Sequence, residues 1–187
     1  MKKFALIIML TVATALLGCN KNVSNSKDQV NDNGAAQASQ IQMSDAMSAD
    51  QAAPDFSLVD TQGKKVSLSQ FKGKVVIIDF WATWCPPCRR GVPDLISLKK
   101  EFKNKIAIIG ISLDVDTKKD VVPFIKNYGI NYPVVYATNQ VVQDYGNVEA
   151  IPTSFIIDRN GKIVKQHVGL TPKGILVDEI TKLLKKS

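Results

Sequence analysis

The sequence has few of the side chains from which metal centres and disulfide frameworks are built. Its 187 residues include three cysteines, Cys19, Cys85 and Cys88, and one histidine, His167. A structural zinc site needs four Cys or His ligands, so we expect no metal. A bond between Cys85 and Cys88 closes too small a loop to constrain the unfolded chain much. A purely structural role for this pair is therefore disfavoured.

The chain also lacks a long hydrophobic run and an internal repeat. The apolar stretch from Phe4 to Leu17 follows two lysines and is shorter than the roughly 20 residues of a membrane span. It is typical of a secretory signal peptide, which we place at residues 1–18. The residues Leu16-Leu17-Gly18-Cys19 resemble the lipobox of bacterial lipoproteins. We therefore expect Cys19 to carry lipid and to anchor the chain at a membrane surface through acyl chains; an uncleaved anchor helix is the alternative.

Aromatic residues are absent from the next segment, residues 20–53, which is rich in Asn, Ser, Gln, Asp and Ala. Such a composition cannot bury enough apolar surface to fold, so residues 19–53 are predicted to be a flexible tether. Residues 54–187 carry 20 basic and 13 acidic side chains, a net charge of +7. This charge suits an anionic membrane surface. Nucleic-acid binding is not expected, because no basic-aromatic motif is present and the signal directs the chain out of the cytoplasm.

Hydrophobic periodicity predicts a single α/β domain over residues 54–187. Two short alternating stretches around Gln62-Gly63 predict a β-hairpin. The continuous apolar runs VVIIDFW and IAIIGISLD predict strands buried on both faces. Helices are predicted after each of these runs and at the C-terminus. Further strands are predicted for YPVVYA, TSFIID and KIVKQHVG. Together these elements indicate a mixed sheet with helices on both sides.

The pair Cys85 and Cys88 lies where the first buried strand gives way to a helix. Unpaired N–H groups and the helix dipole at such a position stabilise a thiolate. Cys88, one helical turn later, can close a ring with Cys85. The placement predicts a redox-active dithiol.

Several stretches together resemble the thioredoxin superfamily, and in particular the TlpA/ResA-like extracytoplasmic thiol–disulfide oxidoreductases. They are DFWATWCPPC, the proline at position 93, NVEAIPTSFIIDRNGKIV and the terminal amphipathic helix, and the resemblance covers residues 52–187. It implies a thioredoxin fold, a central mixed β-sheet flanked by helices, with an N-terminal β-hairpin extension.

The resemblance also implies roles for individual residues. Cys85 is the exposed attacking thiol, and Cys88 is the resolving one. Pro152 follows a cis peptide beside the dithiol, where the backbone pairs with substrate. Asp79 stands where cytoplasmic thioredoxins carry a buried acid, which relays the proton of Cys88; a solvated acid at the strand end is the alternative. The remaining residues expected to contact substrate are Trp84, Pro86, Ile151 and Thr153.

The implied activity is reduction of protein disulfides outside the cytoplasm. Reduction of apocytochrome c during cytochrome c maturation and general repair of exported proteins are two roles found in the family. We expect a monomer with no cofactor beyond its own disulfide, supplied with electrons by an integral membrane thiol carrier. A disulfide-forming oxidase and a redox-inactive or metal-delivery module are the alternatives. His167 is predicted to be a surface strand residue, and Asp114, Asp116 and Asp120 to serve as caps or solvated acids.

Overall fold

Two apolar runs form the centre of a five-stranded sheet in the computed structural model, which describes residues 51–186. They are the parallel strands β3 (Val75–Trp81) and β4 (Ile106–Ser112), buried at every position. The strand order is β5-β4-β3-β6-β7, with β5 (Val134–Tyr136) parallel to β4. The two strands that complete the sheet, β6 (Thr153–Ile157) and β7 (Ile163–Val168), are antiparallel to their neighbours.

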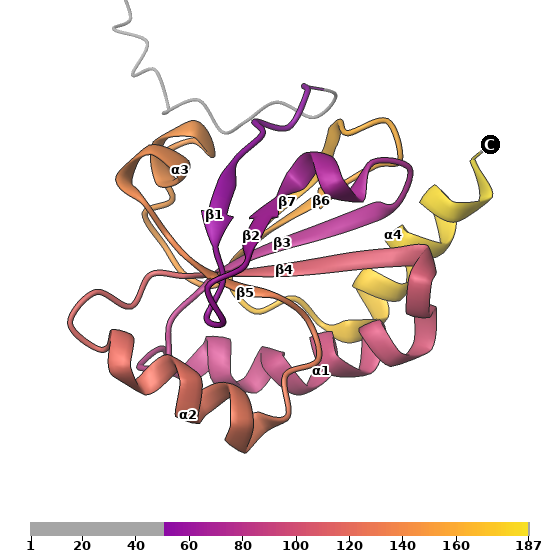
Figure 1. Cartoon of the computed structure of the whole chain (residues 1–187). Helices are drawn as coiled ribbons and strands as arrows, with labels where there is room; N and C mark the ends of the chain where they lie inside the picture. Colours follow the sequence, from indigo (N-terminus) through magenta and orange to yellow (C-terminus); the bar gives the residue numbers. More distant parts are fainter. Residues whose placement is uncertain (1–50, 187) are drawn as a thin grey trace, which may run out of the picture. The chain divides into compact units, whose positions relative to one another are not determined.

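Helices and a hairpin cover the two faces of this sheet (Figure 1). One face packs against α1 (Pro86–Phe102), α2 (Lys118–Tyr128) and α4 (Lys173–Lys185). The other packs against the antiparallel hairpin of β1 (Ser57–Val59) and β2 (Lys65–Ser67), the 3-10 helix η1 (Leu68–Phe71) and α3 (Asn139–Asp144). The predicted thioredoxin fold with an N-terminal hairpin is confirmed.

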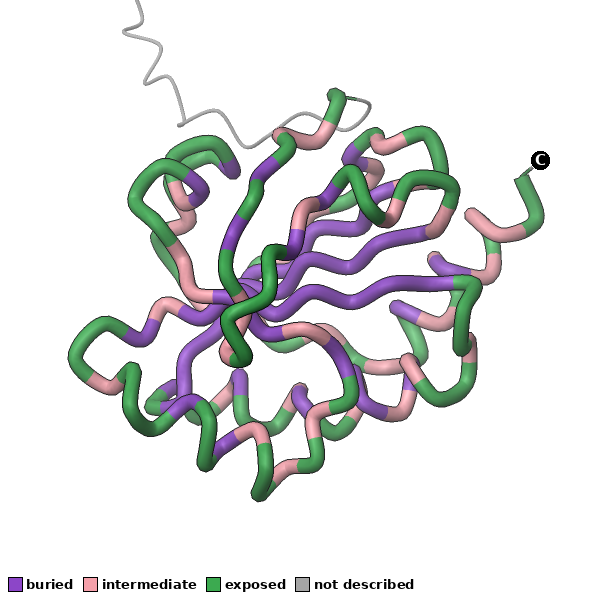
Figure 2. The backbone as a smooth tube through the Cα atoms, in the orientation of Figure 1, coloured by how far each residue is buried: buried purple, intermediate pink, exposed green. Residues whose placement is uncertain are grey.

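The side chains of β3 alternate between two separate cores, since successive residues of a strand point to opposite faces. Ile77 and Trp81 join the core under α1 and α4, whereas Ile78 and Phe80 join the core under the hairpin. Figure 2 shows the resulting band of buried backbone through the middle of the domain. Asp79 therefore occupies a position where the alternation calls for an apolar side chain facing α1.

The structure differs from the sequence-based prediction at two places. The short helix α3 was not predicted, because its NQVVQD sequence buries only Val141 and carries no helical apolar stripe. At the N-terminal boundary, Ala52 forms a β-bridge with Lys162, and Ile163 donates its N–H to the Gln51 carbonyl at 2.8 Å. Residues 51–53, assigned to the tether, thus pair with the domain. The predicted signal peptide, Cys19 and the tether up to residue 50 lie outside the described residues.

Two features of the helices bear on function. Pro93 lies inside α1 and has no N–H with which to continue the helical hydrogen bonding. Within residues 51–186, no helix combines the length and the hydropathy needed to cross a bilayer.

Candidate active site

The two cysteines lie at the start of α1, directly after β3. Cys85 is the N-cap residue, and Pro86 and Pro87 fill the first helical turn, where a missing N–H costs nothing. Cys85 and Cys88 form a disulfide with their Cα atoms 5.3 Å apart. The Cys88 N–H points at the Cys85 sulfur at 3.2 Å, so a thiolate on Cys85 would keep this donor.

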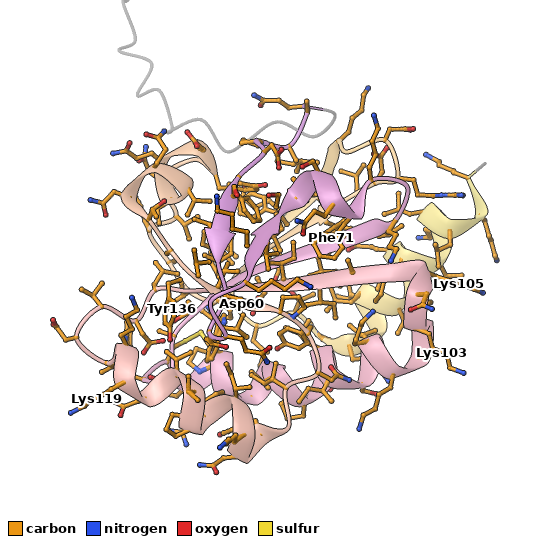
Figure 3. All side chains as sticks on the ribbon, in the orientation of Figure 1. Asp60, Phe71, Lys103, Lys105, Lys119 and Tyr136 are labelled. Atoms are coloured by element: carbon orange, nitrogen blue, oxygen red, sulfur yellow. A yellow bond between two sulfur atoms is a disulfide. The ribbon has the colours of Figure 1, made fainter. Side chains whose placement is uncertain are left out.

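The disulfide is less exposed than predicted. Both cysteines are only 3% exposed, whereas Cys85 was expected to be accessible. The Cys85 sulfur turns inward, toward Cys88 and to within 3.7 Å of the Ile151 carbonyl oxygen. The exposed groups beside it are Trp84, with 58% of its surface accessible, and Pro86. The yellow bond near the start of α1 in Figure 3 marks the disulfide.

The Ile151-Pro152 peptide faces the dithiol and is cis, as the resemblance implied. The Gly169 N–H donates to the Pro152 carbonyl at 2.7 Å, which fixes this segment to the end of β7. Ile151 is half-buried, and the Thr153 side chain is buried and donates to the Ala150 carbonyl at 2.7 Å. Ile151 can thus meet a substrate, whereas the Thr153 hydroxyl is engaged within the loop.

Asp79 lies in the middle of β3 and is 6% exposed, so it is not a solvated strand-end acid. Its carboxylate accepts a 2.7 Å hydrogen bond from Ser154 Oγ on the neighbouring strand β6. Burial disfavours the charged form and raises the pKa of Asp79 to about 7, although the Ser154 hydrogen bond acts in the opposite direction. A carboxyl group with a pKa near neutrality can both accept and release a proton under physiological conditions.

A small cavity joins Asp79 to the dithiol. Its lining includes Asp79, Cys88, Gly91, Asp94 and Pro152, and its volume is about 20 Å³. A cavity needs about 10–15 Å³ measured in this way to hold one water, which must also find polar partners. The cavity that Asp79 and Cys88 both line is therefore large enough for a single water.

Asp114 was predicted to be a cap or a solvated acid, and this prediction is wrong, because the residue is buried beside the active-site loop. It is buried directly after β4, and its carboxylate accepts hydrogen bonds from the Thr83 N–H and from the hydroxyls of Thr83, Ser112 and Thr117. Thr83 lies two residues before Cys85, so Asp114 fixes the loop that leads into the dithiol. Its partner Thr83 is 31 residues away in the sequence, so no local sequence pattern predicts this contact.

We expect Asp114→Ala to destabilise the protein by about 3 kcal/mol or more, because it leaves several buried donors without a partner. Urea unfolding of the oxidised protein measures the change. Asp116→Ala is the matched control, since Asp116 is exposed two residues further on and should change stability by less than about 0.5 kcal/mol. Equal effects of the two substitutions would contradict the structural role of Asp114.

The remaining acids named in the sequence analysis, and the histidine, lie outside the dithiol site. Asp116 and Asp120 are exposed, as predicted. His167 lies on β7, as predicted, but its side chain is only 14% exposed and contacts the Glu179 carboxylate on α4 at 2.9 Å. It therefore ties a strand to a helix and takes no part in the dithiol site.

Comparison with known proteins identifies the family. The family model described as AhpC/TSA family matches residues 49–166. The chain belongs to this family. The thiol-disulfide oxidoreductase ResA of Bacillus subtilis is 39% identical over 127 residues, which cover 67% of this chain and 70% of ResA. This chain is, like ResA, a thiol–disulfide oxidoreductase.

Solved structures agree with this assignment. A thiol:disulfide interchange protein DsbE from Chlorobium tepidum superposes with a TM-score of 0.68 at 36% identity, covering 73% of this chain and 98% of that one. The exposed lipoprotein thioredoxin Etrx1 of Streptococcus pneumoniae gives a TM-score of 0.62 at 30% identity, covering 70% of this chain and all of that one. Both likenesses lie in the domain that carries the Cys85–Cys88 disulfide.

Proposed function

We propose that the protein is a membrane-anchored, extracytoplasmic reductase of protein disulfides. The observation that carries this proposal is the Cys85–Cys88 pair at the start of α1, with the cis Ile151-Pro152 peptide facing it and a buried acid behind it. The rim beside the buried dithiol, formed by Trp84 and Pro86, is thus exposed to an extended peptide, and the inner side shares a cavity with a proton acceptor.

The reaction begins with the reduced protein. The Cys85 thiolate attacks one sulfur of the substrate disulfide, that bond breaks, and the departing substrate thiolate takes up a proton. Cys88, as a thiolate, then attacks Cys85 and releases the second substrate thiol. Two electrons pass from the dithiol to the substrate, and the Cys85–Cys88 disulfide remains. An integral membrane thiol carrier restores the dithiol.

Asp79 serves the second step of this sequence. Cys88 must lose its proton before it can attack, and it is buried beside a cavity that also contacts Asp79. Its proton passes to Asp79 through one water in that cavity. A carboxyl group with a pKa of about 7 accepts this proton at neutral pH and later returns it to solvent.

Substrate contacts come from the rim of the dithiol. Trp84 and Pro86 are exposed on the helix side, and Ile151 is half-buried on the opposite side. A substrate segment lying between them would pair its backbone with that of Ile151 and pack its apolar side chains on Trp84. This arrangement favours extended or unfolded polypeptide, such as apocytochrome c or damaged exported proteins.

The anchor is proposed from the sequence and supported by one relative. Leu16-Leu17-Gly18-Cys19 has the lipobox pattern, and the pneumococcal Etrx1 is described as an exposed lipoprotein thioredoxin. Acylation of Cys19 would hold the domain outside the cytoplasm through the tether. A mass spectrum of the mature protein with an unmodified Cys19 would refute the anchor but leave the dithiol chemistry untouched.

Trapping of reaction partners tests the proposed function. Cys88→Ser removes the resolving thiol, so mixed disulfides between Cys85 and exported proteins are expected to accumulate. Cys85→Ser serves as the matched control and is expected to trap none. Identification of the trapped proteins by mass spectrometry distinguishes cytochrome substrates from general ones. Equal trapping by the two variants would show that Cys85 is not the attacking thiol.

A further inference from the structure

The cavity shared by Asp79 and Cys88 has one exposed residue in its lining, Leu170, which follows β7. Leu170 is 41% exposed, whereas Asp79 and Cys88 are buried. Every other residue of the lining is buried or half-buried. Leu170 therefore contacts the cavity on one side and solvent on the other.

Gly91 allows Leu170 to lie directly against α1. A Cβ atom at position 91 would be 3.0 Å from Leu170 Cδ1, which is closer than the roughly 3.5–4.0 Å at which carbon atoms pack. Any larger residue at position 91 would therefore push the leucine outward. Glycine is disfavoured inside a helix, so the close approach of Leu170 gives a physical reason for its presence here.

The backbone next to Leu170 holds the side chain in this position. Gly169 has a φ of +90°, a conformation that glycine adopts without steric cost. Its N–H donates to the Pro152 carbonyl at 2.7 Å. Leu170 is thus attached to the cis-proline segment through Gly169 and packs on α1 at Gly91, so it spans two walls of the cavity.

The groups that surround Asp79 leave its protonation to depend on the exclusion of water. Cys88 and Asp94 line the same cavity from α1, and α4 contributes an apolar side chain. Ser154 donates a hydrogen bond from β6. Before β5, burial and then the charge of Asp79 raise the pKa of Tyr132. None of these groups is a cation, and desolvation is the main cause that raises the pKa of Asp79.

We propose that Leu170 seals this cavity against solvent, so that the proton of Cys88 passes to Asp79 and is not exchanged with bulk water. The inference rests on the proton relay of the proposed function and adds the residue that isolates it. Leu170 is a positioning residue, because it acts on the reaction through the surroundings of Asp79. If its side chain is shortened, solvent reaches the carboxyl group and favours the charged form, which lowers the pKa of Asp79.

An NMR titration of the Asp79 carboxyl carbon in the oxidised protein tests the seal. Leu170→Ala should lower the titration midpoint by about one pH unit, because the carboxyl group regains hydration. Leu170→Met preserves the side-chain volume and should keep the wild-type midpoint. Val168→Ala is the matched control, since Val168 is an exposed aliphatic residue two positions earlier that does not line the cavity. An unchanged midpoint in Leu170→Ala, or an equal fall in Val168→Ala, would overturn the proposal.

Alkylation of Cys88 measures access to the cavity independently of the titration. In a reduced Cys85→Ser background, iodoacetamide is added and modification of the peptide that contains Cys88 is followed by mass spectrometry. Adding Leu170→Ala should make this modification several-fold faster, whereas adding Val168→Ala should not. Equal rates with and without Leu170→Ala would overturn the seal.

Single-turnover release of the mixed disulfide distinguishes the seal from the relay. In Leu170→Ala, the pH midpoint of release should fall together with the midpoint of Asp79. If the Asp79 midpoint and the alkylation of Cys88 change but the pH profile of release does not, the seal is supported and the relay is refuted. If Asp79→Asn slows release but Leu170→Ala alters neither the Asp79 midpoint nor the alkylation, the relay is supported and the seal is refuted.

Discussion

Asp79→Asn is expected to stabilise the oxidised protein by up to about 4 kcal/mol above pH 7. Burial raises the pKa of Asp79 from 3.8 to about 7, and about 1.4 kcal/mol corresponds to each pKa unit. Since the native state holds this proton more tightly than the unfolded state, stability is greatest below about pH 4. It then falls as the pH rises toward 7 and levels off above that. Asparagine carries no charge and should abolish this fall.

Urea unfolding between pH 4 and pH 9 measures this effect. Asp116→Asn is the matched control, because Asp116 is an exposed acid on the same domain and should leave the profile unchanged. The asparagine amide needs its own partners beside Ser154, which reduces the gain below the full value. An identical pH dependence of unfolding in wild type and Asp79→Asn would show that ionisation of Asp79 is not what destabilises the native state.

The same substitution should also affect the chemistry, through the second step of the reaction. Without a nearby base, Cys88 loses its proton more slowly, so single-turnover release of the mixed disulfide should slow and become more dependent on pH. The attack of Cys85 should change little, because the Cys85 sulfur is supported by the Cys88 N–H and the start of α1. A stability change with unaltered release kinetics would leave Asp79 a structural acid.

We expect the reduction potential of the Cys85–Cys88 pair to lie close to that of thioredoxin, at the reducing end of the range found for this fold. Potentials in this fold range from about −270 mV in thioredoxin to about −120 mV in a strong oxidant, chiefly through stabilisation of the reduced form. Here Pro86 and Pro87 offer neither an N–H nor a side-chain donor to Cys85. Arg89 and Arg90 are exposed, so solvent screens their charge. The thiolate is therefore only moderately stabilised.

Equilibration of the protein with glutathione buffers gives the midpoint. Pro87→His should raise it by about 30–60 mV, since about 30 mV corresponds to 1.4 kcal/mol of added thiolate stabilisation by the imidazole. Pro87→Ala is the matched control, because it restores the N–H without supplying a side-chain donor. A wild-type midpoint near −120 mV would reverse the proposed direction and make the protein a disulfide-forming oxidase.

The sequence specified those features that depend on local pattern. The continuous apolar runs predicted the two central strands, and the C-P-P-C motif at a strand–helix junction predicted the disulfide. The cis Ile151-Pro152 peptide followed only from the family resemblance, because an isolated X-Pro bond gives no local signal. Features that depend on residues distant in the sequence were not predicted. The role of Asp114 depends on its hydrogen bonds with Thr83, and the pairing of residues 51–53 depends on the turn at 161–163. The burial of Cys85 likewise depends on the approach of Ile151.

Pro93 has a consequence for how the dithiol opens. In a regular helix, residue 93 would donate to the carbonyl of Arg89, but proline has no N–H to give. The first turn, which holds Cys88, is thus joined to the rest of α1 by one hydrogen bond fewer. When the sulfur–sulfur bond breaks, the two sulfurs must move apart to non-bonded distance. Because one hydrogen bond fewer resists this movement, a shift of the first turn costs less here than in an unbroken helix and disturbs the packing of the remaining helix against β3 less.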